Sequence, residues 1–166
     1  APRPARVRAS IVIPVFGRVE LTRQCVDELL AHTLSPEIEL IVVDNASPDA
    51  TAEYLASLGG RVRALTNETN LGFARACNQG ARAARGAHLL FLNNDTIPRR
   101  GWLEPLLREL EDPGIAIAGA RLLYADGKVQ HAGIAFSRPD CIPYHVYRGA
   151  HPQHPATMRR RELRAV

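Results

Sequence analysis

The chain has 166 residues, of which 46% are hydrophobic and 23% are charged, and its formal net charge is +4 at pH 7. This length suits one domain with a sizeable hydrophobic core, and the composition excludes a disordered or collagen-like chain. The apolar stretches fall far short of the roughly 18 residues that a membrane-spanning helix needs, and residues 1–9 hold no apolar signal-peptide core. These features predict a soluble, cytoplasmic protein.

The positive charge lies at the two ends of the chain. Residues 1–9 and 157–166 together hold seven arginines and one acid, Glu162, so residues 10–156 carry a net charge of −2. A slightly acidic body in which 5% of the residues are aromatic is not the surface that phosphate-backbone binding or base stacking needs. We therefore expect no nucleic-acid partner. The basic tails suit contact with the inner face of an anionic membrane, although solvated ends are the simpler interpretation.

The three cysteines, Cys25, Cys77 and Cys141, are widely separated along the chain. Their number and spacing give neither a disulfide framework nor a metal-ligand motif, which favours a reducing compartment. No catalytic motif surrounds any of them. We expect each to be a small buried hydrophobic side chain.

Short β-branched runs alternate with longer amphipathic stretches over the first two thirds of the chain. This alternation predicts right-handed crossovers and the α/β class, with a mainly parallel sheet and helices on both faces. In such sheets, ligands bind at the carboxyl ends of the strands. The expected strands are 10–15, 38–43, 62–65 and 87–92, and the expected helices are 19–31, 47–58, 72–84 and 101–111.

Local signals refine the ends of these elements. The Ser47-Pro48 pair is typical of a helix N-cap followed by proline at the first helical position. The Asp126-Gly127 pair predicts a tight reversal between two short apolar pieces. Four prolines and little periodicity follow from Ser137 onward. The expected parts are a basic N-terminal tail over 1–9, an α/β domain over 10–136 and an irregular C-terminal segment over 137–166.

Turn-forming and polar residues follow three of the expected strands. The first strand runs into 14–18, the second into 44–47 and the fourth into 93–96, and all three segments should lie at one edge of the sheet. The sequence lacks both a G-x-G-x-x-G motif after the first strand and a P-loop, which argues against a dinucleotide dehydrogenase and a P-loop nucleotidase. A nucleotide site would then need a carboxylate-held divalent cation to balance the phosphate charge.

Four segments carry a resemblance to a known family. They are 10–16 (SIVIPVF), 41–47 (IVVDNAS), 70–78 (NLGFARACN) and 91–95 (FLNND), in the order and at the spacing seen in family 2 glycosyltransferases. The chain resembles the nucleotide-sugar domain of that family from Ser10 to Val166. The Asn-Asn-Asp form, the Asn-Leu-Gly-Phe segment and 126–133 (DGKVQHAG) resemble the rhamnosyltransferase-like bacterial members, which build surface polysaccharides of the cell wall.

The resemblance implies a fold, a reaction and a set of ligands. The fold is the A-type glycosyltransferase fold of nucleotide-diphospho-sugar transferases. The reaction is an inverting, metal-assisted transfer of a sugar from a UDP- or dTDP-linked donor to a glycan or lipid-linked acceptor. The implied cofactor is Mg²⁺ or Mn²⁺, which would bridge the donor diphosphate.

The resemblance also implies roles for individual residues. Asp44 matches the acid that hydrogen-bonds the base or the ribose, and Asp95 matches the metal-binding acid of a D-x-D-like motif. Asn93 stands where the first carboxylate of that motif would be. The implied nucleotide-binding residues are Pro14, Val15, Phe16, Asp44, Asn70, Arg75 and Asn94, and the implied metal ligand is Asp95.

The general base is not among these residues. In the family it lies in an acidic segment downstream of the matched part, so the chain resembles a member truncated after the donor-binding part, and 137–166 resembles the start of the acceptor-side region. The only acid after Asp140 is Glu162, which lies among four arginines. The resemblance therefore leaves the catalytic base unknown and outside this chain.

Other interpretations stay open. Asp44-Asn45 is also a good turn and cap pair, 93–95 before Pro98 could be a turn, and Asn70 could cap a helix. A nucleotidyltransferase of related topology is one alternative, although it would need a glycine-rich basic loop after the first strand. A catalytically silent nucleotide-binding or interaction module is the other.

Overall fold

The structure, a computed structural model, describes residues 7–138 and 140–159. The chain divides into two units, residues 1–103 and 104–166, and each is described by itself. Parts of the two predicted tails, residues 1–6 and 160–166, lie outside the described residues. Across the described ranges, no helix is both long and apolar enough to cross a membrane. The expected division at residues 136 and 137 stays a prediction.

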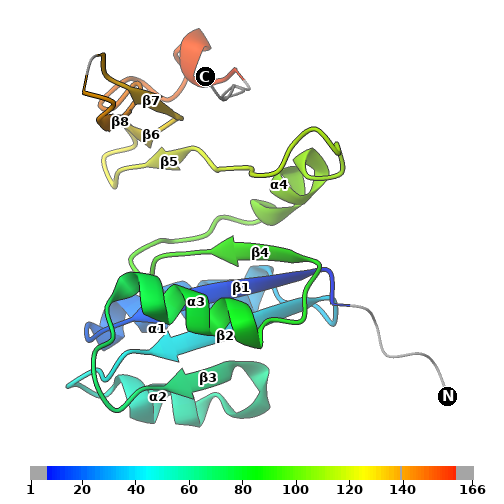
Figure 1. Cartoon of the computed structure of the whole chain (residues 1–166), viewed down its shortest axis with the longest axis vertical. Helices are drawn as coiled ribbons and strands as arrows, with labels where there is room; N and C mark the ends of the chain where they lie inside the picture. The colour runs from blue at the N-terminus through cyan, green and yellow to red at the C-terminus, as the bar shows by residue number, and fades with distance from the viewer. Residues whose placement is uncertain (1–6, 139, 160–166) are drawn as a thin grey trace, which may run out of the picture. The chain divides into compact units, whose positions relative to one another are not determined.

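Four parallel strands form the sheet of the first unit, in the order β3-β2-β1-β4 (Figure 1). Because parallel crossovers are right-handed, α1 and α2 share one face of this sheet, whereas α3, which returns across it to β4, covers the other. The predicted parallel sheet with helices on both faces is confirmed. The elements are β1 (Ala9–Val15), α1 (Val19–His32), β2 (Ile38–Asp44), α2 (Thr51–Ser57), η1 (Gly59–Arg61), β3 (Arg63–Thr66), α3 (Phe73–Ala83) and β4 (His88–Phe91).

The core of this unit lies along the two central strands. The apolar side chains of β1 and β2 are buried nearly completely, because each strand has a neighbour on both sides and helices above and below. Helix α3 approaches this core closely at Gly80, where a Cβ atom would fall inside van der Waals distance of Val12 Cγ1. The small residue at this position lets α3 pack closely against β1 and β2. This packing also positions the chain that leads into the helix at Phe73.

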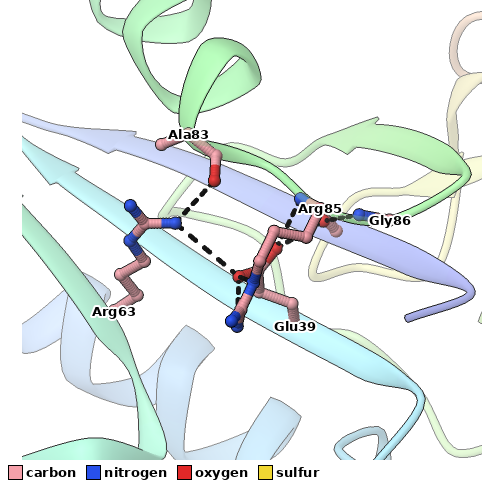
Figure 2. Close-up of polar contacts among 6 residues, drawn as sticks. Glu39, Arg63, Ala83, Arg85 and Gly86 are labelled. Atoms are coloured by element: carbon pink, nitrogen blue, oxygen red, sulfur yellow. Dashed lines mark hydrogen bonds and ion pairs between the residues drawn. The ribbon is translucent and has the colours of Figure 1, made fainter. Parts of the chain in front are cut away.

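A buried carboxylate joins the strands at the end of the sheet where β1 and β2 begin (Figure 2). Glu39 Oε2 accepts hydrogen bonds from Ser10 Oγ at 2.7 Å and from the backbone N–H of Arg85 at 3.0 Å. Glu39 Oε1 accepts one from Arg85 Nε at 2.8 Å and lies 3.9 Å from Arg63 Nη1. Arg63 also donates to the carbonyl oxygen of Ala83. One side chain thus links β1, β2, β3 and the chain that follows α3.

Replacing Glu39 by glutamine should destabilise the protein by about 1–3 kcal/mol, because charge-assisted hydrogen bonds are lost in a buried setting. Burial alone would raise the pKa of Glu39, but the hydrogen bonds from Ser10 and Arg85 bring it below its usual value. The contribution of the ionised Glu39 to the stability of the fold is therefore present above the ordinary glutamate pKa of about 4.3. It is lost as the pH falls through the lower pKa that Glu39 has in the folded state. Thermal melts from pH 3 to pH 7 should show the gap between wild type and Glu39→Gln closing at acid pH. A difference in melting temperature that stays constant over this pH range would show that the ionised carboxylate of Glu39 is not the cause of the stabilisation.

The second unit contains short elements. The predicted reversal is confirmed, since Gly127 has a φ of +82° and Asp126 Oδ1 accepts from the backbone N–H of Lys128. Within the segment expected to be irregular after Ser137, one short strand, β8, pairs antiparallel with β7. The elements after β4 are α4 (Leu103–Glu109), which begins at the last residue of the first unit, β5 (Leu122–Leu123), β6 (Val129–His131), β7 (Ile134–Phe136), β8 (Pro143–His145) and η2 (Pro155–Thr157).

Candidate functional site

The sheet opens between β1 and β4 at the carboxyl ends of the strands. The β1–β4 ladder ends where Leu92 N donates to Val12 O, whereas β1 continues along β2 to Val15. Val12 O faces β4 and Val15 O faces β2, so by alternation Pro14 faces the β4 side, where its missing N–H breaks no ladder bond. The sheet continues from β1 to β2 and β3 on one side, whereas β4 pairs with β1 on the other side. The place between β1 and β4 is therefore the topological switch point, at which open α/β sheets bind ligands.

An open pocket of about 420 Å³ lies at this point. It is built by the segments that follow β1, β2 and β4 and by the chain that enters α3. Two aromatic side chains in its lining are largely exposed, Phe16 at 54% and Phe73 at 63%. The lining residues are Pro14, Val15, Phe16, Asn45, Asn70, Gly72, Phe73, Asn93, Asn94 and Asp95. We call this the sheet-end pocket.

The segments after β1 and β2 are tied to each other below the pocket. Ser47 Oγ accepts a hydrogen bond from Gly17 N at 2.8 Å, and Asp49 Oδ2 accepts one from Val19 N at 2.9 Å. Asp49 Oδ1 accepts from the backbone N–H of Thr51, the first residue of α2. The expected N-cap at Ser47 is therefore wrong, because the Ser47 hydroxyl accepts from the neighbouring loop while Asp49 serves the helix start.

A network of asparagine side chains forms one wall of the pocket. Asn45 Nδ2 donates to Asn70 Oδ1 at 2.6 Å, and Asn45 Oδ1 accepts from Asn67 Nδ2 at 3.1 Å and from Leu71 N at 2.9 Å. Asn70 Oδ1 also accepts from Gly72 N at 2.8 Å. The network joins the end of β2 to the chain before α3, and so fixes Asn70 and Gly72 beside the end of β1.

The segment after β4 forms another wall. Asp95 is exposed in it, while Asn94 is half-buried and its Nδ2 donates to Thr22 Oγ1 at 2.9 Å. The Cys25 thiol donates to the backbone oxygen of Asn93 at 3.8 Å. Burial, and secondly the negative charge of Asp95, raise the pKa of Cys25 to about 12, so it remains a thiol and a donor at neutral pH. Burial thus disfavours the thiolate form that a nucleophilic Cys25 would need.

The predicted site residues fall into two groups. Asp44 is only 1% exposed, its Oδ1 accepts from Ser47 N at 2.9 Å, and it lies outside the pocket lining. Arg75 is exposed on α3 and is not part of the lining either. These two residues form the group outside the lining, and the ligand roles of all the predicted site residues stay predictions. The six that the structure brings together in the lining are Pro14, Val15, Phe16, Asn70, Asn94 and Asp95.

Four lining residues have no predicted ligand role, namely Asn45, Gly72, Phe73 and Asn93. Asn45 directly follows Asp44, so its place at a strand end was a usable signal. Phe73 is an apolar residue on the exposed start of a helix, a position that periodicity alone cannot distinguish from a core residue. Of the cysteines, Cys25 and Cys77 are buried as expected, whereas Cys141 is exposed, which corrects that expectation.

The acidic residue of the pocket lining is Asp95. Within residues 7–138 and 140–159, no cluster of three or more His, Cys, Asp or Glu side chains could hold a metal ion by itself. A cation at this pocket would take one carboxylate from Asp95 and its other ligands from neutral oxygens or from substrate phosphates. Such a site suits Mg²⁺ or Mn²⁺, because Mg²⁺ in particular is commonly held by one or two carboxylates together with substrate phosphates.

Sequence comparison identifies relatives of the chain. Residues 10–161 match the family described as Glycosyl transferase family 2. The O-antigen biosynthesis protein RfbC of Myxococcus xanthus is 35% identical over 130 residues, which cover 76% of this chain and 10% of that protein. The uncharacterized glycosyltransferase EpsJ of Bacillus subtilis is 33% identical over 113 residues, covering 66% of this chain and 32% of that protein. The chain thus spans a tenth to a third of the length of these relatives.

Solved structures share the fold. The mannosyltransferase PcManGT from Pyrobaculum calidifontis, in complex with GDP-Man and Mn²⁺, matches with a TM-score of 0.60 at 25% identity, over 69% of this chain and 36% of that chain. TarS 1–349 of S. aureus in complex with UDP-GlcNAc matches with a TM-score of 0.59 at 18% identity, over 69% and 37%, which shows the fold alone. The family match covers most of the residues, and a mannosyltransferase shares the fold. This chain therefore belongs to glycosyltransferase family 2.

Proposed function

We propose that the first unit binds the nucleoside diphosphate of a UDP- or dTDP-linked sugar, as the donor-binding part of an inverting glycosyltransferase. The observation that carries this proposal is the sheet-end pocket, which lies at the topological switch point and combines exposed aromatic rings with amide groups and one carboxylate. A ring such as Phe16 or Phe73 suits stacking against a base or a sugar, and the amides suit hydroxyl groups. The complex of PcManGT with GDP-Man and Mn²⁺ supports the same class of ligand.

The residues present fit a divalent cation that arrives with the diphosphate. Asp95 is exposed at the pocket and would supply one carboxylate ligand, with the diphosphate oxygens and water completing the shell. The neighbouring Asn93 and Asn94 carry amide oxygens, which are also hard donors. When bound, Mg²⁺ or Mn²⁺ would neutralise the charge that develops on the leaving diphosphate. The chain's own part is to hold Asp95 and the amides at the end of β4.

The acceptor and the setting are further parts of this proposal. The acceptor is a glycan or a lipid-linked acceptor in polysaccharide biosynthesis, which the O-antigen biosynthesis role of RfbC supports. An acceptor hydroxyl needs a general base, and the sequence resemblance puts that base outside the matched donor part. The cytoplasmic location and the membrane contact of the basic tails stay predictions, since residues 1–6 and 160–166 lie outside the described residues.

Asp44 provides a test of base or ribose recognition. If its second carboxylate oxygen accepts a hydrogen bond from the nucleoside, Asp44→Asn should weaken UDP binding about tenfold or more, since bonds to charged groups are worth about 1.5–3 kcal/mol. The melting temperature should also fall, because Asp44 is buried and accepts from Ser47 N. Calorimetry and thermal melts on the same samples measure both effects. A lower melting temperature with unchanged UDP affinity would assign Asp44 to the loop alone.

The proposed function is tested by a thermal-shift panel on the full chain. The ligands are UDP, dTDP and GDP, each with Mn²⁺ and with EDTA, and UMP serves as the control with one phosphate fewer. A ligand that binds only the folded state raises its stability by mass action. We expect the largest shifts with UDP or dTDP in the presence of Mn²⁺. A larger shift with GDP would overturn the choice of base, and no shift with any nucleotide would overturn the proposed function.

A further inference from the structure

Helix α1 lies directly behind the segment that follows β4. Thr22 and Cys25 are three residues apart on α1, so they share one face of the helix, and both are completely buried. Thr22 Oγ1 accepts the hydrogen bond from Asn94 Nδ2 at 2.9 Å, and Cys25 Sγ donates to Asn93 O at 3.8 Å. Two successive residues of the pocket wall are therefore held by one face of one helix.

These contacts matter because the sheet no longer holds the chain at this point. The last ladder bond between β4 and β1 is the one from Leu92 N to Val12 O, and the segment then leaves the sheet. Beyond it, the segment forms a turn in which Thr96 N donates to Asn93 O. That bond fixes the local shape of the segment. Its position relative to the pocket depends on side-chain contacts such as those from α1.

The Thr22 contact also orients the amide of Asn94. The two polar atoms of an amide diverge from one carbon atom, so holding Nδ2 against α1 turns Oδ1 away from the helix. Asn94 lines the pocket, and its neighbour Asp95 would hold the cation. A rotation of this segment would move both groups, and metal sites lose affinity when the contacts behind their ligands are removed.

We propose that Thr22 is a positioning residue for the cation and diphosphate site, with Cys25 giving weaker support to the same segment. This inference rests on the proposed function. Thr22 touches neither ligand nor cation, and it acts through Asn94 by fixing the segment that carries Asp95. Valine has the shape of threonine but cannot accept from Asn94 Nδ2, which would leave a buried donor without its partner. Serine keeps the hydroxyl and is the matched conservative replacement.

The test compares wild type, Thr22→Val and Thr22→Ser as full chains, by calorimetry of UDP binding in Mn²⁺ and in EDTA. Removing a contact behind a metal ligand typically costs 10- to 100-fold in affinity, so Thr22→Val should lose about tenfold or more in Mn²⁺ and little in EDTA. Thr22→Ser should restore most of the Mn²⁺ affinity. The electron paramagnetic resonance signal of bound Mn²⁺ with UDP gives a second readout, which should change in Thr22→Val and return toward wild type in Thr22→Ser.

The outcomes separate this inference from the proposed function. Equal losses in Mn²⁺ and EDTA, or no loss in either, would overturn the positioning role while leaving donor binding intact. A wild type with the same UDP affinity in both solutions would overturn the metal part of the proposed function and this inference with it. Cys25→Ala keeps the test open if Thr22→Val does not fold, and it should show a smaller loss confined to Mn²⁺. An unchanged Mn²⁺ affinity in Cys25→Ala would then count against the inference.

Discussion

Replacement of Asp95 by alanine is expected to remove the whole metal-dependent part of UDP binding. Asp95 is the carboxylate of the sheet-end pocket, and no cluster within the described residues could hold a cation without help from a ligand. The affinities measured by calorimetry in Mn²⁺ and in EDTA should therefore become equal in the variant. The melting temperature of the free protein should change little, because the side chain is exposed.

The control for this change is Glu53→Ala. Glu53 is an exposed acid on α2 and is absent from the pocket lining, so its removal changes the net charge by the same amount. It should leave the Mn²⁺ effect at the wild-type value. If Asp95→Ala keeps a Mn²⁺ effect of wild-type size, the cation is held elsewhere and the proposed role of Asp95 is wrong.

Replacement of Gly86 by alanine should destabilise the fold by about 3 kcal/mol, the upper end of what overpacking usually costs. A Cβ atom at Gly86 would lie 2.5 Å from Ser10 N and 2.6 Å from the carbonyl carbon of Ala9. Both neighbours are backbone atoms of β1, so no side-chain rotation can relieve the contact. The N–H of Gly86 also donates to Ser10 Oγ, within the Glu39 network. Chemical denaturation with urea would measure the loss.

Gly60→Ala is the matched control, because a Cβ atom there would meet nothing within 4 Å and the backbone needs no left-handed conformation. It should leave the stability unchanged or raise it slightly, since alanine restricts the unfolded chain. If Gly86→Ala were as stable as Gly60→Ala, the close approach of this turn to β1 would not be a feature of the folded protein.

The fold could be predicted from the sequence because its central elements are long and periodic. The run from Ser10 to Val15 is apolar and β-branched, as a strand buried on both faces must be, and α1 follows it with one apolar side. Element ends were harder to predict. The helix start near Ser47 depends on which partner each side chain finds, and Ser47 bonds to Gly17, 30 residues away. A local pattern holds no information about such a partner.

The site was predictable where strands end in polar residues and not where distant residues meet. Asn94 and Asp95 follow a strand, and ligands of open α/β sheets bind at the carboxyl ends of the strands, so their place at the pocket could be predicted. The network of Asn45 with Asn70 joins residues 25 apart, and Thr22 meets Asn94 across 72 residues. In the sequence, Thr22 is one polar residue within an amphipathic helix. Its role depends on the tertiary packing of α1 against the segment after β4.

The most direct test of nucleotide binding at the carboxyl ends of β1, β2 and β4 is paramagnetic broadening in NMR spectra of the ¹⁵N-labelled full chain. Mn²⁺ would be added in trace amounts with UDP and, separately, without it. With UDP, we predict selective broadening of the amide signals of 15–16, 70–73 and 93–95, which surround the sheet-end pocket. Without UDP the broadening should be weak, because the diphosphate supplies most of the ligands. Broadening centred on other residues, or equal broadening with and without UDP, would contradict the proposed site.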